Sequence, residues 1–74
     1  MIFNYEQKQF SLSVNKAMKI KNVIKKLTQE HDIIPRNIGL YFFNNGNFDK
    51  LDDSQHIKDY DIKNNSELTI LALN

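Results

Sequence analysis

Side chains that could carry acid–base or metal chemistry are few and scattered in this chain of 74 residues. His31 and His56 are its two histidines, and they lie in different segments of a sequence without cysteine. A protein metal site needs several such donors close together. No serine has a base at a recognisable spacing, and neither glycine belongs to a phosphate-binding loop. We therefore expect no enzyme, no metal and no cofactor, and we expect both histidines to lie at the surface near helix ends.

Aspartates cluster in the second half of the chain. Paired carboxylates can act as catalytic acid and base, and a loop of alternating acids can bind calcium when a glycine and a distant glutamate follow. The spacing here lacks that pattern, so we expect turn and capping roles. Asp59 is expected to cap a local turn, and Tyr60 to pack its ring while its hydroxyl bonds to the loop backbone. The clustered acids are Asp52, Asp53, Asp59 and Asp61.

Charge is nearly balanced overall but unevenly distributed along the chain. Ten Lys and Arg residues against nine Asp and Glu residues give a formal net charge of +1. This balance argues against a dedicated nucleic-acid binder, whose affinity rests on neutralising phosphates. Bases gather early and acids late, which predicts a molecule with two charged poles that could orient a partner. The early bases are Lys16, Lys19, Lys21, Lys25 and Lys26.

The length predicts one small domain over residues 1–74 with a single modest core. No apolar run approaches the roughly 20 residues that span a bilayer, and the first residues do not resemble a signal peptide. The absence of cysteine makes the cytoplasm or the nucleus the default location. We therefore expect a monomeric domain without a membrane partner.

Alternating apolar residues predict a hairpin at the start of the chain, formed by residues 1–5 and 10–14. A two-residue turn at Gln7 and Lys8 would set Phe3 opposite Leu12 and place all the alternating apolar side chains on one face. The Gln-Lys pair lacks the Asn-Gly chemistry that tight hairpins favour, which leaves a bulge or a longer loop open.

One amphipathic helix is expected over Lys19–Glu30. Its apolar residues recur at i, i+3, i+4 and i+7, which places them on one stripe. Pro35 prevents the helix from continuing, so it should end near His31 or Asp32. The apolar stripe consists of Ile20, Val23, Ile24 and Leu27.

A second hairpin is predicted after the helix. Residues 38–43 have the aromatic content of a strand, and Asn45 and Gly46 favour a tight turn because both tolerate positive φ. A turn centred there sets Phe43 opposite Phe48. One short helical turn follows, and the alternation in residues 68–73 predicts a last strand. The apolar anchors of the helical turn are Ile57, Tyr60 and Ile62.

This order of elements resembles the ubiquitin-like family over nearly the whole chain. Lys19–Leu27 looks like the family's helix, Ile34-Pro35 stands where the family has an Ile-Pro turn, and Leu40–Phe42 matches its Leu-Ile-Phe segment. The resemblance implies an α+β fold of the β-grasp type: a mixed sheet of four to five strands, packed on one α-helix, with the last strand central. The other matching segments are residues 51–53, 57–62 and 66–68.

The resemblance also implies a protein-binding patch on the sheet face that the helix does not cover. The family builds this patch from one residue of the third strand and two of the last, and here Tyr41 replaces its isoleucine and Thr69 its histidine. The second hairpin is longer than in the family and could add exposed aromatic anchors. Alternatively, Phe43 and Phe48 fold over the sheet as a small core of their own. The predicted partner-binding residues are Tyr41, Phe43, Phe48, Thr69, Leu71 and Leu73, with Ile2 at the margin.

The resemblance therefore implies a noncovalent protein–protein interaction module of the ubiquitin–proteasome system. We expect it to be the N-terminal module of a larger protein, with a proteasome subunit, a ubiquitin-binding domain or an unfoldase as partner. One alternative is a scaffold in another pathway, such as RNA processing, that uses the basic helix. Another is a conjugable modifier whose end has been trimmed. Conjugation needs a Gly-Gly tail, whereas the given sequence ends in Leu73-Asn74.

Overall fold

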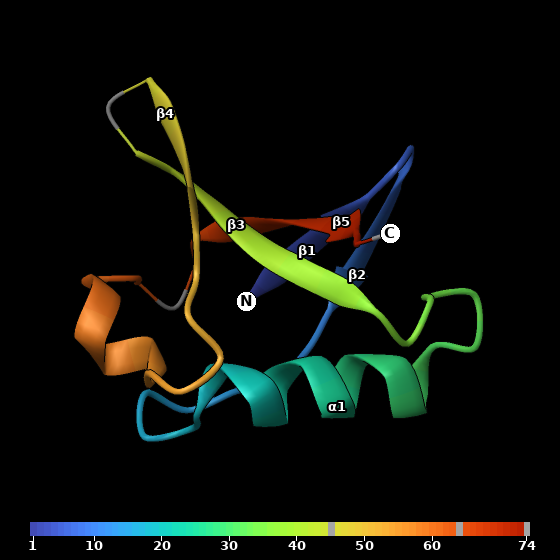
Figure 1. Ribbon diagram of the computed structural model, residues 1–74, viewed down its shortest axis with the longest axis horizontal. Helices are drawn as coiled ribbons and strands as arrows, with labels where there is room; N and C mark the ends of the chain where they lie inside the picture. The colour runs from blue at the N-terminus through green and yellow to red at the C-terminus, as the bar shows by residue number, and fades with distance from the viewer. Residues whose placement is uncertain (45, 64, 74) are drawn as a thin grey trace.

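The computed structural model describes the whole chain except residues 45, 64 and 74. The described residues form five strands, one α-helix and one short 3-10 helix, shown in Figure 1. None of the described helices is long and apolar enough to cross a membrane. In chain order the elements are β1 (Ile2–Tyr5), β2 (Lys8–Ser11), α1 (Ile20–Glu30), β3 (Ile38–Asn44), β4 (Asn47–Lys50), η1 (Ile57–Tyr60) and β5 (Glu67–Ala72).

The strands form one mixed sheet of order β2-β1-β5-β3-β4. β5 runs parallel to β1 and antiparallel to β3, and both hairpins are antiparallel. Helix α1 packs against one face of this sheet, as Figure 1 shows. The structure thus confirms the predicted α+β fold of the β-grasp type with a central last strand, and it settles the number of strands at five.

The first hairpin has the predicted inward face but not the predicted register. Phe3 pairs with Phe10 rather than with Leu12, because the turn lies at Glu6 and Gln7, one residue earlier in the chain than predicted. Glu6 has a φ of 55°, the positive value that tight hairpin turns need. The pairing shifts by two residues, an even number, so every side chain stays on its predicted face.

Helix α1 begins at Ile20 and ends at Glu30, close to the predicted bounds. No side chain caps its first turn. Instead, the backbone N–H groups of Ile20 and Lys21 donate to the carbonyl oxygens of Gln55 and Asp53, at 2.8 and 3.2 Å. The loop before η1 therefore supplies the cap that the local sequence lacks. The buried stripe consists of Ile20, Val23 and Leu27, with Ile24 packed beside it.

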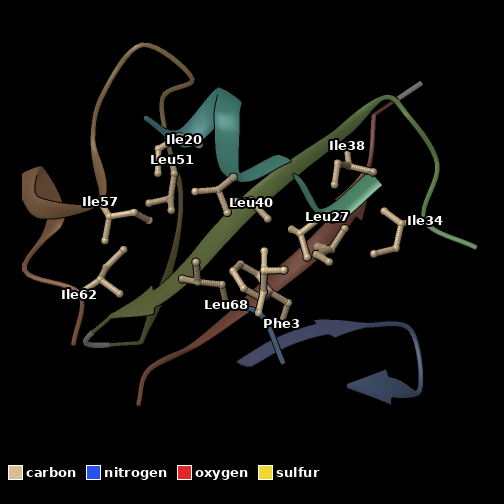
Figure 2. Close-up of a cluster of buried hydrophobic side chains, with 13 residues drawn as sticks. Phe3, Ile20, Leu27, Ile34, Ile38, Leu40, Leu51, Ile57, Ile62 and Leu68 are labelled. Atoms are coloured by element: carbon tan, nitrogen blue, oxygen red, sulfur yellow. The ribbon is translucent and has the colours of Figure 1, made fainter. Parts of the chain in front are cut away.

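The hydrophobic core fills the space between α1 and the sheet, as Figure 2 shows. Phe3, Leu40 and Leu68 come from three adjacent strands and are fully buried. Ile57 begins η1 and Ile62 follows it, and the two side chains close one end of the core. Burying one side chain of this size stabilises the fold by about 1.5–3 kcal/mol. The remaining core residues are Leu12, Ile20, Val23, Leu27, Ile34, Ile38, Leu51 and Ile70.

The segment around η1 confirms the predicted capping roles. Asp59 Oδ2 accepts a hydrogen bond from the backbone N–H of His56 at 2.8 Å. The Tyr60 hydroxyl accepts one from the backbone N–H of Asp52, also at 2.8 Å, while its ring packs against the core. Asp61 ends the turn in the left-handed conformation, with φ 44°.

The second hairpin has the predicted register, with Phe43 opposite Phe48. Gly46 has the expected positive φ, 85°, whereas Asn45, the other predicted turn residue, lies outside the described residues. All four residues of β4 are exposed. In Figure 1 this hairpin extends beyond the rest of the sheet.

Candidate protein-binding face of the sheet

The strand pairing places the predicted partner-binding residues on one face. Tyr41 pairs with Thr69 and Gly39 pairs with Leu71, and paired residues of neighbouring strands point to the same side of a sheet. Their chain neighbours Leu40 and Ile70 are buried against the helix side. Tyr41 and Leu71 therefore lie on the opposite side, which we call the outward face.

Gly39 forms a low point on the outward face that three longer side chains cover. A Cβ atom at Gly39 would lie 3.1 Å from Cε1 of Tyr41, 3.2 Å from Cε of Lys50 and 3.4 Å from Cδ2 of Leu73. The Tyr41 ring and the Lys50 stem therefore lean across the backbone of β3 instead of standing away from the sheet. Because Gly39 has no side chain, Tyr41 and Leu73 can come together over its backbone.

The hairpin aromatics extend this apolar surface along β3 and β4. Phe43 and Phe48 contact each other edge to face, with ring centroids 5.2 Å apart. They nevertheless remain 58% and 59% exposed, and Leu71 is 47% exposed. The two phenylalanines therefore pack together without forming an enclosed core of their own, and most of their surface stays available. The residues on this apolar half of the outward face are Tyr41, Phe43, Phe48, Leu71 and Leu73.

The half of the outward face over β1 and β2 is polar. Asn4 pairs with Gln9 on one side and with Thr69 on the other, so all three point outward. Glu67 Oε1 accepts hydrogen bonds from the side-chain amides of Asn4 and Gln9, at 3.0 and 3.5 Å. Ile2 pairs with Glu67 and lies in this half. Thr69 thus marks the border between the polar and the apolar halves.

The basic side chains of α1 form a separate surface on the far side of the molecule. Lys21 and Lys25 are exposed, and the ammonium of Lys26 donates to the carbonyl oxygen of Ser13 at 2.8 Å. Among the described residues, the one ion-pair contact joins His56 Nδ1 to Asp59 Oδ2 at 3.4 Å, so no acid neutralises these lysines within the described chain.

The side chains considered for acid–base chemistry make local structural contacts. Hydrogen bonds from the backbone N–H and the hydroxyl of Ser54 hold the pKa of Asp52 below its ordinary value of 3.8. The backbone N–H of His56 does the same for the pKa of Asp59. His31 follows the last residue of α1, and its ring stacks on Phe10 with centroids 4.3 Å apart. No three His, Asp or Glu side chains lie close enough to hold a metal ion within the described residues.

The comparison with known proteins identifies the family of this chain. A family model described as Ubiquitin-2 like Rad60 SUMO-like matches residues 2–71. The chain belongs to this family. The match covers every strand and the helix except Ala72 at the end of β5, so all of the outward face except Leu73 lies within the matched range. The predicted membership of the ubiquitin-like family is confirmed.

Solved structures show the same fold. The solution NMR structure of the ubiquitin-like domain of an Arabidopsis thaliana protein matches with a TM-score of 0.81 at 20% sequence identity. The match covers 96% of this chain and 72% of that chain. At this identity the likeness shows the fold alone, and a fold does not decide a function. Comparison with the curated proteins gives no match.

Sequence reasoning missed two contributors to the outward face of the Rad60 SUMO-like domain. Gly39 was not expected to shape it, although a glycine inside a strand pattern signals a close approach of other groups. Lys50 was not assigned to the face either, but its pairing with Tyr41 follows from the hairpin register that the Asn-Gly turn predicts. Counting back from that turn would have identified Lys50.

Proposed function

We propose that this Rad60 SUMO-like domain is a noncovalent protein-binding module of the ubiquitin–proteasome system that receives its partner on the outward face. The observation that carries the proposal is the apolar half of that face. Three of its large side chains, Phe43, Phe48 and Leu71, are about half exposed or more. Adjoining exposed apolar side chains of this kind mark interaction sites on soluble proteins.

The geometry of the apolar half supports binding with little reorganisation. The Tyr41 ring leans over Gly39, and Phe43 contacts the Phe48 ring edge to face. Side chains that already hold one position lose little conformational freedom when a partner covers them. Aromatic residues in such positions commonly carry a large share of interface energy. Lys50 at the margin of the patch offers a cation to an acidic residue of the partner.

The candidate partners are a proteasome subunit, a ubiquitin-binding domain or an unfoldase. The support is positional: Tyr41, Thr69 and Leu71 occupy the sites that form the binding patch of the ubiquitin-like family, and the strand pairing brings all three to one face. An aromatic ring at the first site and a hydroxyl at the second give the patch a different shape, so a receptor adapted to an aromatic anchor is favoured. A cytoplasmic or nuclear location is part of the proposal.

The test replaces Tyr41 and Leu71 by Ala, singly, and measures affinity for proteasomal receptor domains by isothermal titration. Each truncation of an anchor is expected to weaken binding by about 2 kcal/mol, which is roughly 30-fold. Ile33→Ala is the matched control, because Ile33 is an equally exposed aliphatic residue, 50% against 47% for Leu71, in the loop after α1. Unchanged affinity in both outward-face variants would refute the assignment.

The exposed lysines of α1 support one second candidate, a scaffold that binds an acidic partner through the helix. Lys21 and Lys25 have no acidic neighbour in contact among the described residues. Salt separates the two proposals, because exposed charges are screened over about 10 Å at 0.1 M salt whereas apolar burial is not. Affinity that falls steeply with salt and is lost in a Lys21→Ala, Lys25→Ala variant would favour the helix.

A further inference from the structure

The free edge of β4 carries unpaired backbone groups next to exposed aromatic rings. Among the described strands, β4 stands at one end of the sheet order and β2 at the other. An edge strand presents N–H and C=O groups that can pair with another strand. Since all four β4 residues are exposed, no described segment covers this edge.

The hydrogen-bond pattern identifies which β4 groups point to the free edge. The backbone N–H of Leu51 donates to the carbonyl oxygen of Leu40 at 2.8 Å, so these two residues form a hydrogen-bonded pair. The next pair along the same ladder is Tyr41 with Lys50. Hydrogen-bonded and non-hydrogen-bonded pairs alternate along an antiparallel ladder. The backbone groups of Lys50, and two residues earlier those of Phe48, therefore point away from β3. The N–H and C=O groups of Phe48 and Lys50 thus define the edge at which another strand can pair.

The side chains distinguish the β4 edge from the β2 edge. The outward side chains of β2 are Gln9 and Ser11, so a strand added there would cover polar groups. A strand added beside β4 would cover Phe48 and, through it, Phe43, both now more than half exposed. Apolar burial therefore favours the β4 edge.

The charges of β4 argue against a second copy of this chain as the occupant. In a symmetric antiparallel pair that uses the free backbone groups of both strands, Phe48 would face Lys50 of the second copy. Asp49 would then lie directly opposite Asp49 of that copy, and like charges opposite each other destabilise a sheet. Centring the pair on Phe48 would instead require Gly46, which has a φ of 85° and lies outside β4, to act as a strand residue.

We propose that the β4 edge binds an extended segment of another protein as a sixth strand, and that this segment carries an acidic, a basic and an apolar residue in succession. In an antiparallel arrangement, the pairing that is slightly more stable per residue, the acid lies beside Lys50, the base beside Asp49 and the apolar residue beside Phe48. The acid and the apolar residue point outward with Lys50 and Phe48, and the base points to the helix side with Asp49. The edge site differs from the outward-face site in using backbone groups.

The probe is a blocked eight-residue peptide with Glu-Arg-Val at its centre, and its matched control is the same peptide with Lys-Asp-Val. NMR titration of the 74-residue domain is expected to shift the amide signals of Phe48 and Lys50 most. The control peptide places a like charge beside both Lys50 and Asp49, so binding weakens about tenfold. Exchanging the two charges, in an Asp49→Lys, Lys50→Asp variant, reverses the preference between the peptides.

A pair of variants at one position separates the backbone from the side chain. Lys50→Ala keeps the N–H group that points to the free edge, whereas Lys50→Pro removes it and leaves the bonds between β3 and β4 in place. Binding of the Glu-Arg-Val peptide falls about tenfold further in the proline variant than in the alanine variant. The β3–β4 cross-strand NOEs of both variants report whether the hairpin is retained.

Three results with the peptide probes would overturn the proposal. They are equal affinity for the two peptides, equal affinity of the two Lys50 variants, and shifts centred on Gln9 and Ser11 at the β2 edge. A dimer in sedimentation that the proline variant abolishes would assign the edge to a second copy instead. Because the receptor test relies on Leu71 and this test on the Lys50 backbone, either site can fail while the other stands.

Discussion

Replacing Gly39 by Ala tests whether the packing over β3 controls the shape of the binding face. The added Cβ would lie 3.1 Å from Tyr41 Cε1 and 3.2 Å from Lys50 Cε, which is a few tenths of an ångström closer than ordinary contacts. Each contacting atom belongs to the far part of a side chain. The backbone of β3 can therefore stay in place while the Tyr41 ring and the Lys50 stem move outward.

The opposing contributions to stability in this variant nearly cancel. Alanine is favoured over glycine inside a strand by roughly 0.5–1 kcal/mol, because the unfolded chain has less freedom to lose. Holding a displaced ring away from its preferred rotamer costs about 0.5–1.5 kcal/mol. Gly39 does not have a positive φ, so alanine adds no backbone strain. The free energy of unfolding should therefore change by less than about 1 kcal/mol.

Binding should respond more than stability does. The Tyr41 ring is expected to move off the sheet, which shifts its aromatic NMR signals and weakens partner binding about tenfold, as for a displaced anchor. Urea denaturation gives the stability, and titration with the receptor domain gives the affinity. A loss of stability above about 2 kcal/mol, or unchanged Tyr41 signals, would show that the side chains over Gly39 do not move as the geometry requires.

Two further predictions concern the fold. Phe3→Ala removes a fully buried ring and should cost about 3–5 kcal/mol in urea denaturation, with a much smaller loss for Ile2→Ala on the other face of β1. Similar losses at both positions would contradict the assignment of inward and outward faces. The hydrogen bond from the backbone N–H of His56 holds the folded-state pKa of Asp59 below its ordinary value of 3.8. The stability that this bond contributes is therefore fully present above pH 3.8 and disappears as the pH falls through the folded-state pKa. Asp59→Ala should therefore lower the free energy of unfolding at pH 7 but not at a pH below the folded-state pKa. An equal loss in the two conditions would contradict the role of the ionised carboxylate.

Local sequence patterns predicted most of the fold, because they act over a few residues. The i, i+3, i+4 spacing of Ile20, Val23 and Leu27 predicted the helix, and the period-2 alternation predicted the faces of the strands. The Asn-Gly turn was enough to place Phe43 opposite Phe48. Each of these features depends on geometry that a short segment fixes by itself.

Features that depend on contacts between distant segments were not predicted. The cap of α1 comes from carbonyl groups more than thirty residues later in the chain, at Asp53 and Gln55, and no local signal at Lys19 indicates it. The first-hairpin register was missed because Glu6 adopts positive φ despite having a side chain that rarely does so.

The candidate site was predicted in its members but not in its shape. The resemblance to ubiquitin-like domains identified Tyr41, Thr69 and Leu71, and the strand pairing puts all three on one face. The covering of Gly39 depends on Lys50 and Leu73, which come from other segments of the chain and meet Tyr41 there. The sequence alone could not show how far Phe43 and Phe48 stay exposed, since that depends on how the hairpin extends from the sheet.

The most direct test of the binding face is chemical-shift mapping of the 15N-labelled domain against a proteasomal receptor domain at low and high salt. We predict that the amide signals of Tyr41, Phe43 and Leu71 shift together and that the apparent affinity changes little with salt. Shifts confined to Lys21 and Lys25 on the helix, and lost at high salt, would contradict the outward face as the binding site.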